Sequence, residues 1–247
     1  MKKWFPVMLD MEGRKVVVVG GGAVAARRAG ELAGAGAGVT VISPDFHPDL
    51  MRMIESGQVR AIRSRYTGPG QLQGAWLAVA ATGDGEVNRE VCRDAERLGI
   101  LWNDASDAER SALLVPRTIR RGRLVIAVST SGASPGLAKR IAAEIGERFG
   151  EEYAEYAEFL AELREKAKRR VKDEKRRKMI FESALKSDIL ESIEKNRAER
   201  AKWIERLLEN QLPSAAETES KNETTDRGGH QTKRPGADSD ESGDRKP

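Results

Sequence analysis

Three consecutive glycines near the start of the chain are the strongest chemical signal in the sequence. They follow the apolar run Lys15–Val19, which predicts a strand buried on both faces, and they precede 23–29, whose composition favours a helix. Gly20, Gly22 and Ala25 match the G-x-G-x-x-G/A pattern. There the first glycine permits a turn, the second lets the backbone approach a pyrophosphate, and the small last residue allows close helix–strand packing. We therefore expect a dinucleotide site; the alternative is a tight turn that binds nothing.

Two further loops are expected at the same edge of the sheet as the glycines. They are 82–84 and 103–107, which follow two other predicted strands. In an open α/β sheet, ligands bind outside the carboxyl ends of the strands. A carboxylate there, Asp104 or Asp107, could accept a proton while a hydride leaves for a nicotinamide. A role as a turn or cap residue is the alternative for either aspartate.

The residues after the second predicted strand bear on the choice of cofactor. An NAD site usually has an acidic residue there for the ribose 2′-hydroxyl, whereas this chain has Ser43, with Asp45 two residues further on. No arginine or lysine follows immediately to meet a 2′-phosphate. The pattern favours NAD over NADP.

A basic hairpin followed by a hydroxyl-rich loop is suited to an anionic ligand. The hairpin carries Arg117, Arg120, Arg121 and Arg123. The loop 129–134 leads into a helix that Ser134 should cap and Pro135 should open. Exposed N–H groups, hydroxyls and cations together favour a carboxylate or phosphate site. The candidate ligands are Arg121, Ser129, Thr130 and Ser134; the alternative is a capped helix beside a solvated hairpin.

Alternating strands and helices must position these loops. The predicted strands are 15–19, 39–42, 59–62, 75–81 and 100–103, and the predicted helices between them are 23–35, 48–56 and 86–98. This alternation predicts a parallel, doubly wound sheet. Two more strands, 112–116 and 124–128, are expected around the basic turn 120–123, and the pattern from 151 to about 208 is helical.

The composition excludes several classes of protein. One cysteine and two histidines leave no disulfide framework, cysteine-based zinc site or histidine cluster. No segment approaches the roughly 18 apolar residues of a membrane span, and the N-terminus lacks a secretory core, so we expect a cytoplasmic protein. The basic run 166–178 is interrupted by acidic residues and has no interleaved aromatics. It favours a solvated helix face over a nucleic-acid site.

The motifs together resemble the precorrin-2 dehydrogenase family, which includes the amino-terminal module of the fused siroheme synthases. The resemblance covers about residues 4–150. It is carried, in order and spacing, by Phe5-Pro6-Val7, the glycine run with Ala23-Val24-Ala25, Ser43-Pro44, Ala80-Ala81-Thr82, Val87-Asn88, Pro116 with Arg121-Gly122, and 129–135.

The resemblance implies an NAD-dependent oxidation of precorrin-2 to sirohydrochlorin, and some members of the family also insert ferrous iron. It implies a homodimer, joined through the segment after the Rossmann domain. The resemblance places the cofactor on Ala23, Val24, Pro44 and Asp45. With Gly20, Gly22, Ser43 and Thr82 from the loops at the strand ends, these are the expected cofactor residues. The tetrapyrrole substrate carries many carboxylates, which suits the arginine-rich hairpin and the capped helix.

The expected architecture is α/β: a Rossmann-type parallel sheet, a small α+β dimerisation segment and a helical carboxyl-terminal region. The corresponding boundaries are 1–111 for the NAD-binding domain, 112–150 for the dimerisation and substrate segment, 151–212 for the helical domain and 213–247 for a tail expected to be disordered.

The chain departs from the family at the catalytic position. The family's catalytic aspartate commonly ends an Asn-Val-Val-Asp stretch, and ungapped matching from Asn103 puts Ser106 there. Asp107 is then the first candidate base and Asp104 the second. Because the chain has no histidine cluster, only these carboxylates could serve iron insertion. A non-catalytic NAD-sensing module is the alternative function.

Overall fold

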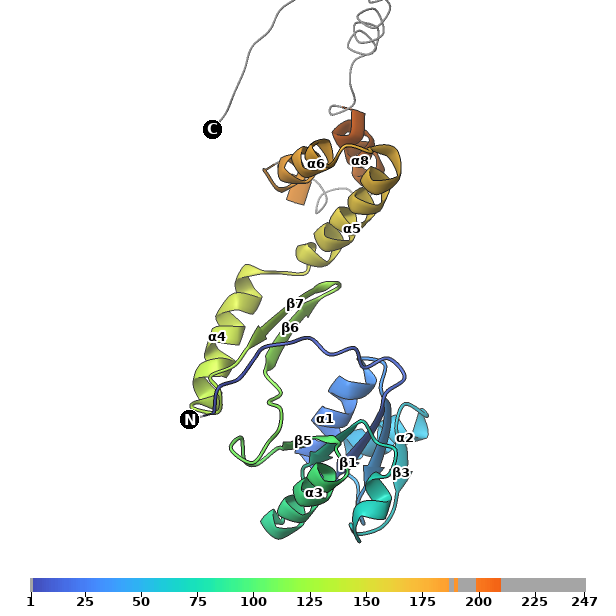
Figure 1. Ribbon diagram of the computed structural model, residues 1–247, viewed down its shortest axis with the longest axis vertical. Helices are drawn as coiled ribbons and strands as arrows, with labels where there is room; N and C mark the ends of the chain where they lie inside the picture. Colours follow the sequence, from blue (N-terminus) through green and yellow to red (C-terminus); the bar gives the residue numbers. More distant parts are fainter. Residues whose placement is uncertain (1, 187–188, 191–198, 210–247) are drawn as a thin grey trace, which may run out of the picture. The chain divides into compact units, whose positions relative to one another are not determined.

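The computed structural model describes residues 2–186, 189–190 and 199–209, and the chain divides into two compact units between Gly150 and Glu151 (Figure 1). The first unit contains the sheet and a hairpin, and the second contains helices. The tail expected to be disordered, 213–247, and residues 210–212 of the expected helical domain lie outside the described residues. No helix in the described part of the chain is both long and apolar enough to cross a membrane.

Five parallel strands form the sheet of the first unit, in the order β3-β2-β1-β4-β5 (Figure 1). Their bounds are Lys15–Val19 for β1, Gly38–Ile42 for β2, Arg60–Ile62 for β3, Leu77–Ala80 for β4 and Leu101–Asp104 for β5. The strand order reverses on either side of β1, so a crevice for a ligand is expected at the carboxyl ends of β1, β2 and β4. The predicted parallel sheet is confirmed.

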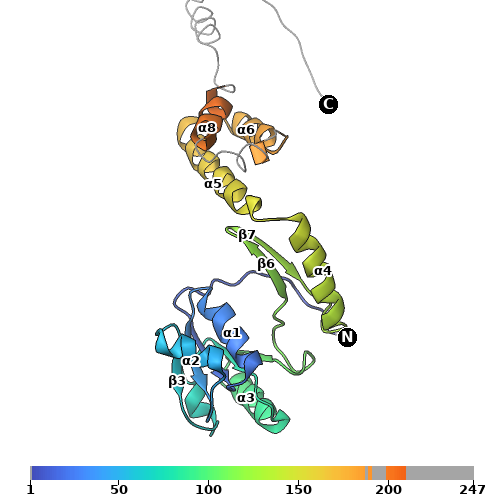
Figure 2. The same ribbon diagram turned by 180° about the vertical axis from the view of Figure 1, so that it is seen from behind.

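Helices cover both faces of this sheet (Figures 1 and 2). Helices α1 (Ala23–Ala33) and α2 (Pro48–Glu55) pack on one face, where Ala25 and Ala29 meet Val16 and Val18. Helix α3 (Gly85–Arg97) and the 3-10 turn η1 (Pro69–Leu72) pack on the other face. The buried side of α1 is made of alanines. Because methyl groups take little room, the helix lies close to the sheet and its N-terminus is held at the strand ends.

An antiparallel hairpin and a helix complete the first unit. Strands β6 (Arg117–Arg121) and β7 (Leu124–Val128) pair, and α4 (Pro135–Arg148) packs against them. The predicted strand 112–116 is wrong. The N–H groups of Ala112 and Leu113 both donate to the Trp102 carbonyl, so they form no regular hydrogen-bond ladder with a neighbouring strand. Pro116 has no N–H group to donate. The first strand of the hairpin begins at Arg117, after the proline, and Arg120 and Arg121, which were expected in the turn, lie in this strand.

The second unit is a small helical bundle with its own core. Helices α5 (Glu152–Arg170), α6 (Glu174–Lys186) and α8 (Glu199–Glu209) surround Phe159, Leu163, Ile180 and Ile204, all fully buried. The Arg170 guanidinium donates to the Glu205 carboxylate at 2.5 Å and lowers its pKa. The helical pattern predicted from 151 is confirmed over these elements.

Tyr66 ties the loop after β3 to helix α3. Its hydroxyl donates to the Asp94 carboxylate at 2.9 Å, and Asp94 is 5% exposed. Burial and this carboxylate raise the pKa of Tyr66. We expect Tyr66→Phe to lower the free energy of unfolding by about 1–3 kcal/mol, since it removes a donor from a buried carboxylate. Urea unfolding measures this. The control is Arg97, whose largely exposed guanidinium lies 3.7 Å from the same carboxylate. Arg97→Ala should lower the free energy of unfolding by less than about 1 kcal/mol. Equal losses of stability in the two variants would contradict the prediction.

Cys92 should make stability depend on alkaline pH. Burial, and next the Asp104 carboxylate, raise the pKa of this thiol from 9.0 to about 11. Because the folded pKa lies above the unfolded one, the thiol's contribution is complete below pH 9 and is lost as the pH rises toward 11. Urea unfolding at pH 7, 9 and 10.5 should therefore show a steeper decline for the wild type than for Cys92→Ala. Parallel declines would refute this assignment.

Candidate dinucleotide and substrate site

The first glycine of the run makes the turn that leaves β1. Gly20 has φ +129°, a conformation that side chains disfavour, and a Cβ there would overlap the Ala81 carbonyl. Its N–H donates to the Ile42 carbonyl at 2.9 Å. The turn therefore meets the residues that follow β4 on one side and the last residue of β2 on the other.

The second glycine lies against the loop that follows β2. A Cβ on Gly21 would overlap the Asp45 carbonyl and would stand 2.5 Å from the Ser43 hydroxyl. The Gly21 carbonyl accepts from the His47 N–H at 2.7 Å. Ser43 is mostly buried by this contact, while Pro44 and Asp45 are exposed. Three predicted cofactor residues thus lie beside the glycine run.

The third glycine begins helix α1 and leaves it uncapped. Gly22 is the N-cap residue, no side chain in the described chain accepts from the first helical N–H groups, and the first turn has no acidic residue. A Cβ on Gly22 would meet nothing within 4 Å, and Ala23 and Val24 are exposed. Unsatisfied N–H groups at a helix N-terminus with open space before them suit a pyrophosphate. These residues fit a dinucleotide.

A buried amide links the loops after β4 and β5. The Asn88 carbonyl oxygen accepts from the Thr82 hydroxyl at 2.7 Å and from the Thr82 N–H at 3.1 Å. The amide nitrogen donates to the Thr82 carbonyl at 3.2 Å and to the Ser106 hydroxyl at 3.5 Å. Asn88 was not among the predicted site residues. Its polar side chain on the buried face of α3 was the available signal.

Asp104 is the buried centre of the loop that follows β5. Its side chain has no exposure. One carboxylate oxygen accepts from the Ser106 N–H at 2.9 Å and from the Ser106 hydroxyl at 2.5 Å, and the other accepts from Arg110 Nε at 3.2 Å. The loop is therefore organised around this carboxylate, and the Ser106 hydroxyl, in an exposed residue, is hydrogen-bonded to it.

Asp107 presents the accessible carboxylate of the same loop. Its side chain is 33% exposed. One oxygen accepts from the N–H groups of Glu109 and Arg110 at 2.9 and 3.4 Å, and the other is 3.1 Å from an Arg110 guanidinium nitrogen. Arg110 thus pairs with both candidate bases. Sequence reasoning missed it because nothing in its spacing shows that two carboxylates would face it.

The hydroxyl-rich loop lies against the Asp104–Ser111 loop. Ser131 and Gly132 have positive φ values, and a Cβ on Gly132 would stand 2.8 Å from the Ala108 Cβ. Ser134 caps α4 as predicted, accepting from the Leu137 N–H at 3.2 Å. The Thr130 hydroxyl accepts from the Ser134 N–H and donates to its carbonyl, both at 3.0 Å. The predicted base loop and the predicted anion-binding loop are therefore brought together.

Arg121 lies at the other end of α4. It donates to the carbonyls of Phe149 and Gly146 at 3.1 and 3.3 Å, in the last turn of that helix. Ser134 caps the first turn, so roughly 20 Å of helix separates the two predicted substrate ligands. A role for Arg121 in substrate binding stays a prediction.

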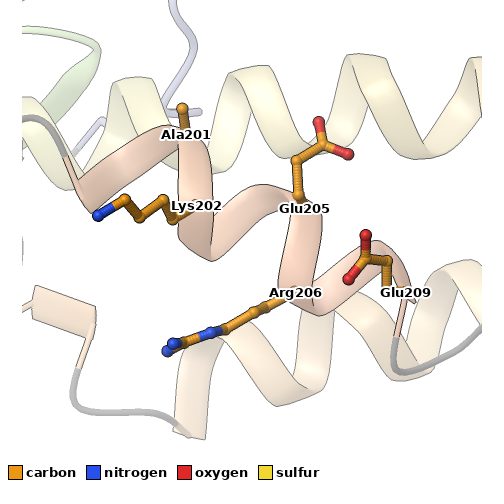
Figure 3. Close-up of a pocket in the computed structure, with 5 residues that line it drawn as sticks. All are labelled: Ala201, Lys202, Glu205, Arg206 and Glu209. Atoms are coloured by element: carbon orange, nitrogen blue, oxygen red, sulfur yellow. The ribbon is translucent and has the colours of Figure 1, made fainter.

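A surface hollow in the helical unit offers no comparable chemistry. Figure 3 shows the residues that line it, all on α8: Ala201, Lys202, Glu205, Arg206 and Glu209. Glu205 is already paired with Arg170. Within the described ranges, no group of three or more His, Cys, Asp or Glu side chains could hold a metal ion.

Comparison with known proteins agrees with both units. A family described as putative NAD(P)-binding matches residues 7–117, and the sirohaem synthase dimerisation region matches 152–212. The siroheme synthase of Methylobacillus flagellatus is 36% identical over 197 residues, which is 80% of this chain and 42% of the relative. That of Chromobacterium violaceum is 37% identical over 191 residues, which is 77% of this chain and 40% of the relative. The chain therefore spans about two fifths of these relatives.

One solved structure is matched along its whole length. SirC, a precorrin-2 dehydrogenase, is 30% identical, superposes with a TM-score of 0.68, and covers 83% of this chain and 100% of its own. The chain belongs to the precorrin-2 dehydrogenase and siroheme synthase family. The NAD(P)-binding match includes the glycine run, so the nucleotide-binding domain of the family is the sheet described above. The dimerisation match falls on the helical unit, and a dimer contact through 112–150 stays a prediction.

Two neighbouring glycines separate folding from cofactor binding. Gly22→Ala should fold normally, because φ is −80° and the space is open, but the added methyl group should weaken NAD binding about tenfold by standing where the pyrophosphate approaches. Gly21→Ala should instead lower the free energy of unfolding by about 1–3 kcal/mol through overlap with the Asp45 backbone. Calorimetric NAD titration and urea unfolding measure the two effects. The same effect in both variants would disprove the distinction.

Proposed function

We propose that this chain oxidises precorrin-2 to sirohydrochlorin with NAD. The observation that carries the proposal is the match to SirC, a precorrin-2 dehydrogenase, over all of that protein's length. The loops that meet at the sheet edge support it independently. They combine an uncapped helix N-terminus, an accessible carboxylate and a hydroxyl-rich helix cap.

The residues at the α1 N-terminus would hold the cofactor. Bound NAD supplies the hydride acceptor. The N–H groups of Ala23 and Val24 would bind its pyrophosphate, with Gly20 and Gly22 leaving room for it. Ser43, Pro44 and Asp45 would meet the adenosine ribose, because the β2 loop lies against the glycine run. Thr82 is fixed by Asn88 at the adjoining edge and would line the site.

Asp107 would accept the proton that leaves the substrate. Of the two candidate aspartates it is the partly exposed one, with 33% of its side chain accessible, whereas the Asp104 side chain is fully buried. A base must reach the proton that it abstracts, so exposure decides between them. Asp104 would then position the loop, and the Ser106 hydroxyl would be presented beside Asp107.

The substrate carboxylates would be bound by the loop 129–134. Ser129 and Ser131 are exposed, and the loop leads into the α4 N-terminus, which favours anions. Arg121 remains a further proposed ligand.

Iron insertion, which some family members perform, also needs a base for the pyrrole protons. Asp107 is the accessible aspartate of the loop that follows β5, so any such activity should be lost together with the oxidation in Asp107→Asn.

We also propose that the protein is a homodimer. The match of 152–212 to the sirohaem synthase dimerisation region supports this. We expect precorrin-2 to be the small-molecule partner and expect no nucleic-acid or membrane partner. Sedimentation velocity at micromolar concentration should give twice the mass of the 27.2 kDa chain; a monomer would refute the proposed dimer.

Anaerobic incubation of the protein with precorrin-2 and NAD should produce NADH absorbance and the sirohydrochlorin spectrum together. Asp107→Asn should reduce kcat at least about 100-fold, since a positioned base contributes a factor of that order. Ser106→Asp should lower activity as well, because it replaces a hydroxyl that donates to the buried Asp104 carboxylate with a second negative charge.

Glu109→Gln is the matched control for these variants. It removes an exposed carboxylate from the same loop and should leave kcat within twofold. Full activity in Asp107→Asn would exclude Asp107 as the base. If the wild type binds NAD but never turns over precorrin-2, the proposed oxidation is wrong and the sensing module is favoured.

A further inference from the structure

The carboxyl end of β2 lacks the usual feature of an NAD-selective site. Selectivity for NAD commonly comes from an acidic residue at the end of this strand, which accepts from the ribose 2′-hydroxyl and repels a 2′-phosphate. Ser43 occupies that place and is mostly buried against Gly21. The nearest carboxylate, Asp45, is 96% exposed. The end of the strand is therefore not protected against an added phosphate.

The sheet places an arginine beside this strand end. Strands β2 and β3 pair in parallel, with Ile42 opposite Ile62, and the Ser43 N–H donates to the Ile62 carbonyl at 3.2 Å. Arg63 is the first residue after β3, so it stands next to Ser43 across the pairing. Because Arg63 is distant from Ser43 in the sequence, the residues that directly follow Ser43 give no sign of this arginine.

The Arg63 guanidinium is fixed over the β2 loop by two contacts. One terminal nitrogen donates to the Pro44 carbonyl at 3.0 Å, and the guanidinium lies 5.2 Å from the centre of the Phe46 ring. The same nitrogen is 3.9 Å from an Asp45 carboxylate oxygen. The side chain is 62% exposed, and its other N–H groups have no hydrogen-bond partner within the described ranges. A planar group with several donors is thus held in place with donors left for an anion.

We infer that Arg63 forms a 2′-phosphate subsite, through which this chain binds the phosphorylated dinucleotide NADP as well as NAD. The inference rests on the proposed dinucleotide site. A pyrophosphate at Gly22 and Ala23 puts the adenosine ribose over Ser43 to Asp45, because Gly21 lies against that loop. A phosphate on the ribose then meets the guanidinium, whose geometry matches phosphate oxygens. The Asp45 carboxylate, which is 96% exposed and 3.9 Å from the same guanidinium, would compete with the phosphate for Arg63.

Two nucleotides that differ only in the 2′-phosphate test the subsite without any redox chemistry. Adenosine 5′-diphosphate and 2′-phosphoadenosine 5′-diphosphate would be titrated into the full chain by calorimetry. We expect the wild type to bind the 2′-phosphorylated probe at least fivefold more tightly. Arg63→Ala should weaken that probe about tenfold or more and leave the unphosphorylated probe within twofold.

Arg60→Ala is the matched control. Arg60 is an exposed arginine at the amino end of the same strand, opposite the ligand edge, and its loss should change neither affinity by more than twofold. Asp45→Asn should strengthen binding of the 2′-phosphorylated probe, since it removes the neighbouring negative charge.

Equal weakening of both probes in Arg63→Ala would overturn the subsite, because Arg63 would then support the loop and not the phosphate. Failure of the wild type to prefer the 2′-phosphorylated probe would overturn it as well, while binding of the unphosphorylated probe would leave the proposed dinucleotide site standing. If the chain bound neither probe and did not bind NAD, both the dinucleotide site and the subsite would be refuted.

Discussion

The close approach of bare backbone at Gly20 and Gly21 is the constraint on which the candidate site depends. One glycine lies against the Ala81 carbonyl and the other against the Asp45 carbonyl, at separations that admit no side chain. The residues after β2 and β4 therefore converge on the residues after β1. The N–H groups of α1 are aimed at the same point, because the alanine face of that helix holds it close to the sheet.

A buried carboxylate, Asp104, holds the other half of the candidate site together, as the glycines hold the first half. The Asp104 carboxylate has no exposure and receives Arg110 and Ser106, while Arg110 also reaches Asp107. A buried carboxylate is tolerated only when its lone pairs are satisfied, so the loop has little freedom to rearrange. The exposed groups of this loop are thus positioned by a buried carboxylate and by Arg110, whose side chain is 38% exposed.

The parts that the sequence predicted are those decided by local pattern. The run Lys15–Val19 and its glycines imply a buried strand and a turn, and Ser134 with Pro135 implies a helix start; all are present. The strand expected at 112–116 failed because its N–H groups bond to Trp102, a partner that no local pattern reveals. Arg110 and Arg63 escaped notice for the same reason, since their partners are set by loop folding and strand pairing. The predicted roles of Asp104, Ser106 and Asp107 still await measurement.

The close approach of Gly132 to Ala108 bears on the proposed substrate site. Glycine and alanine are the two smallest residue types, and here they lie where the hydroxyl-rich loop meets the aspartate loop. If the hydroxyl-rich loop binds a substrate carboxylate and Asp107 is the base, as proposed, the separation of these two loops limits the width of the ring system between them. A methyl group added at Gly132 would overlap the Ala108 side chain, so a larger residue there would force the two loops apart without altering any polar group.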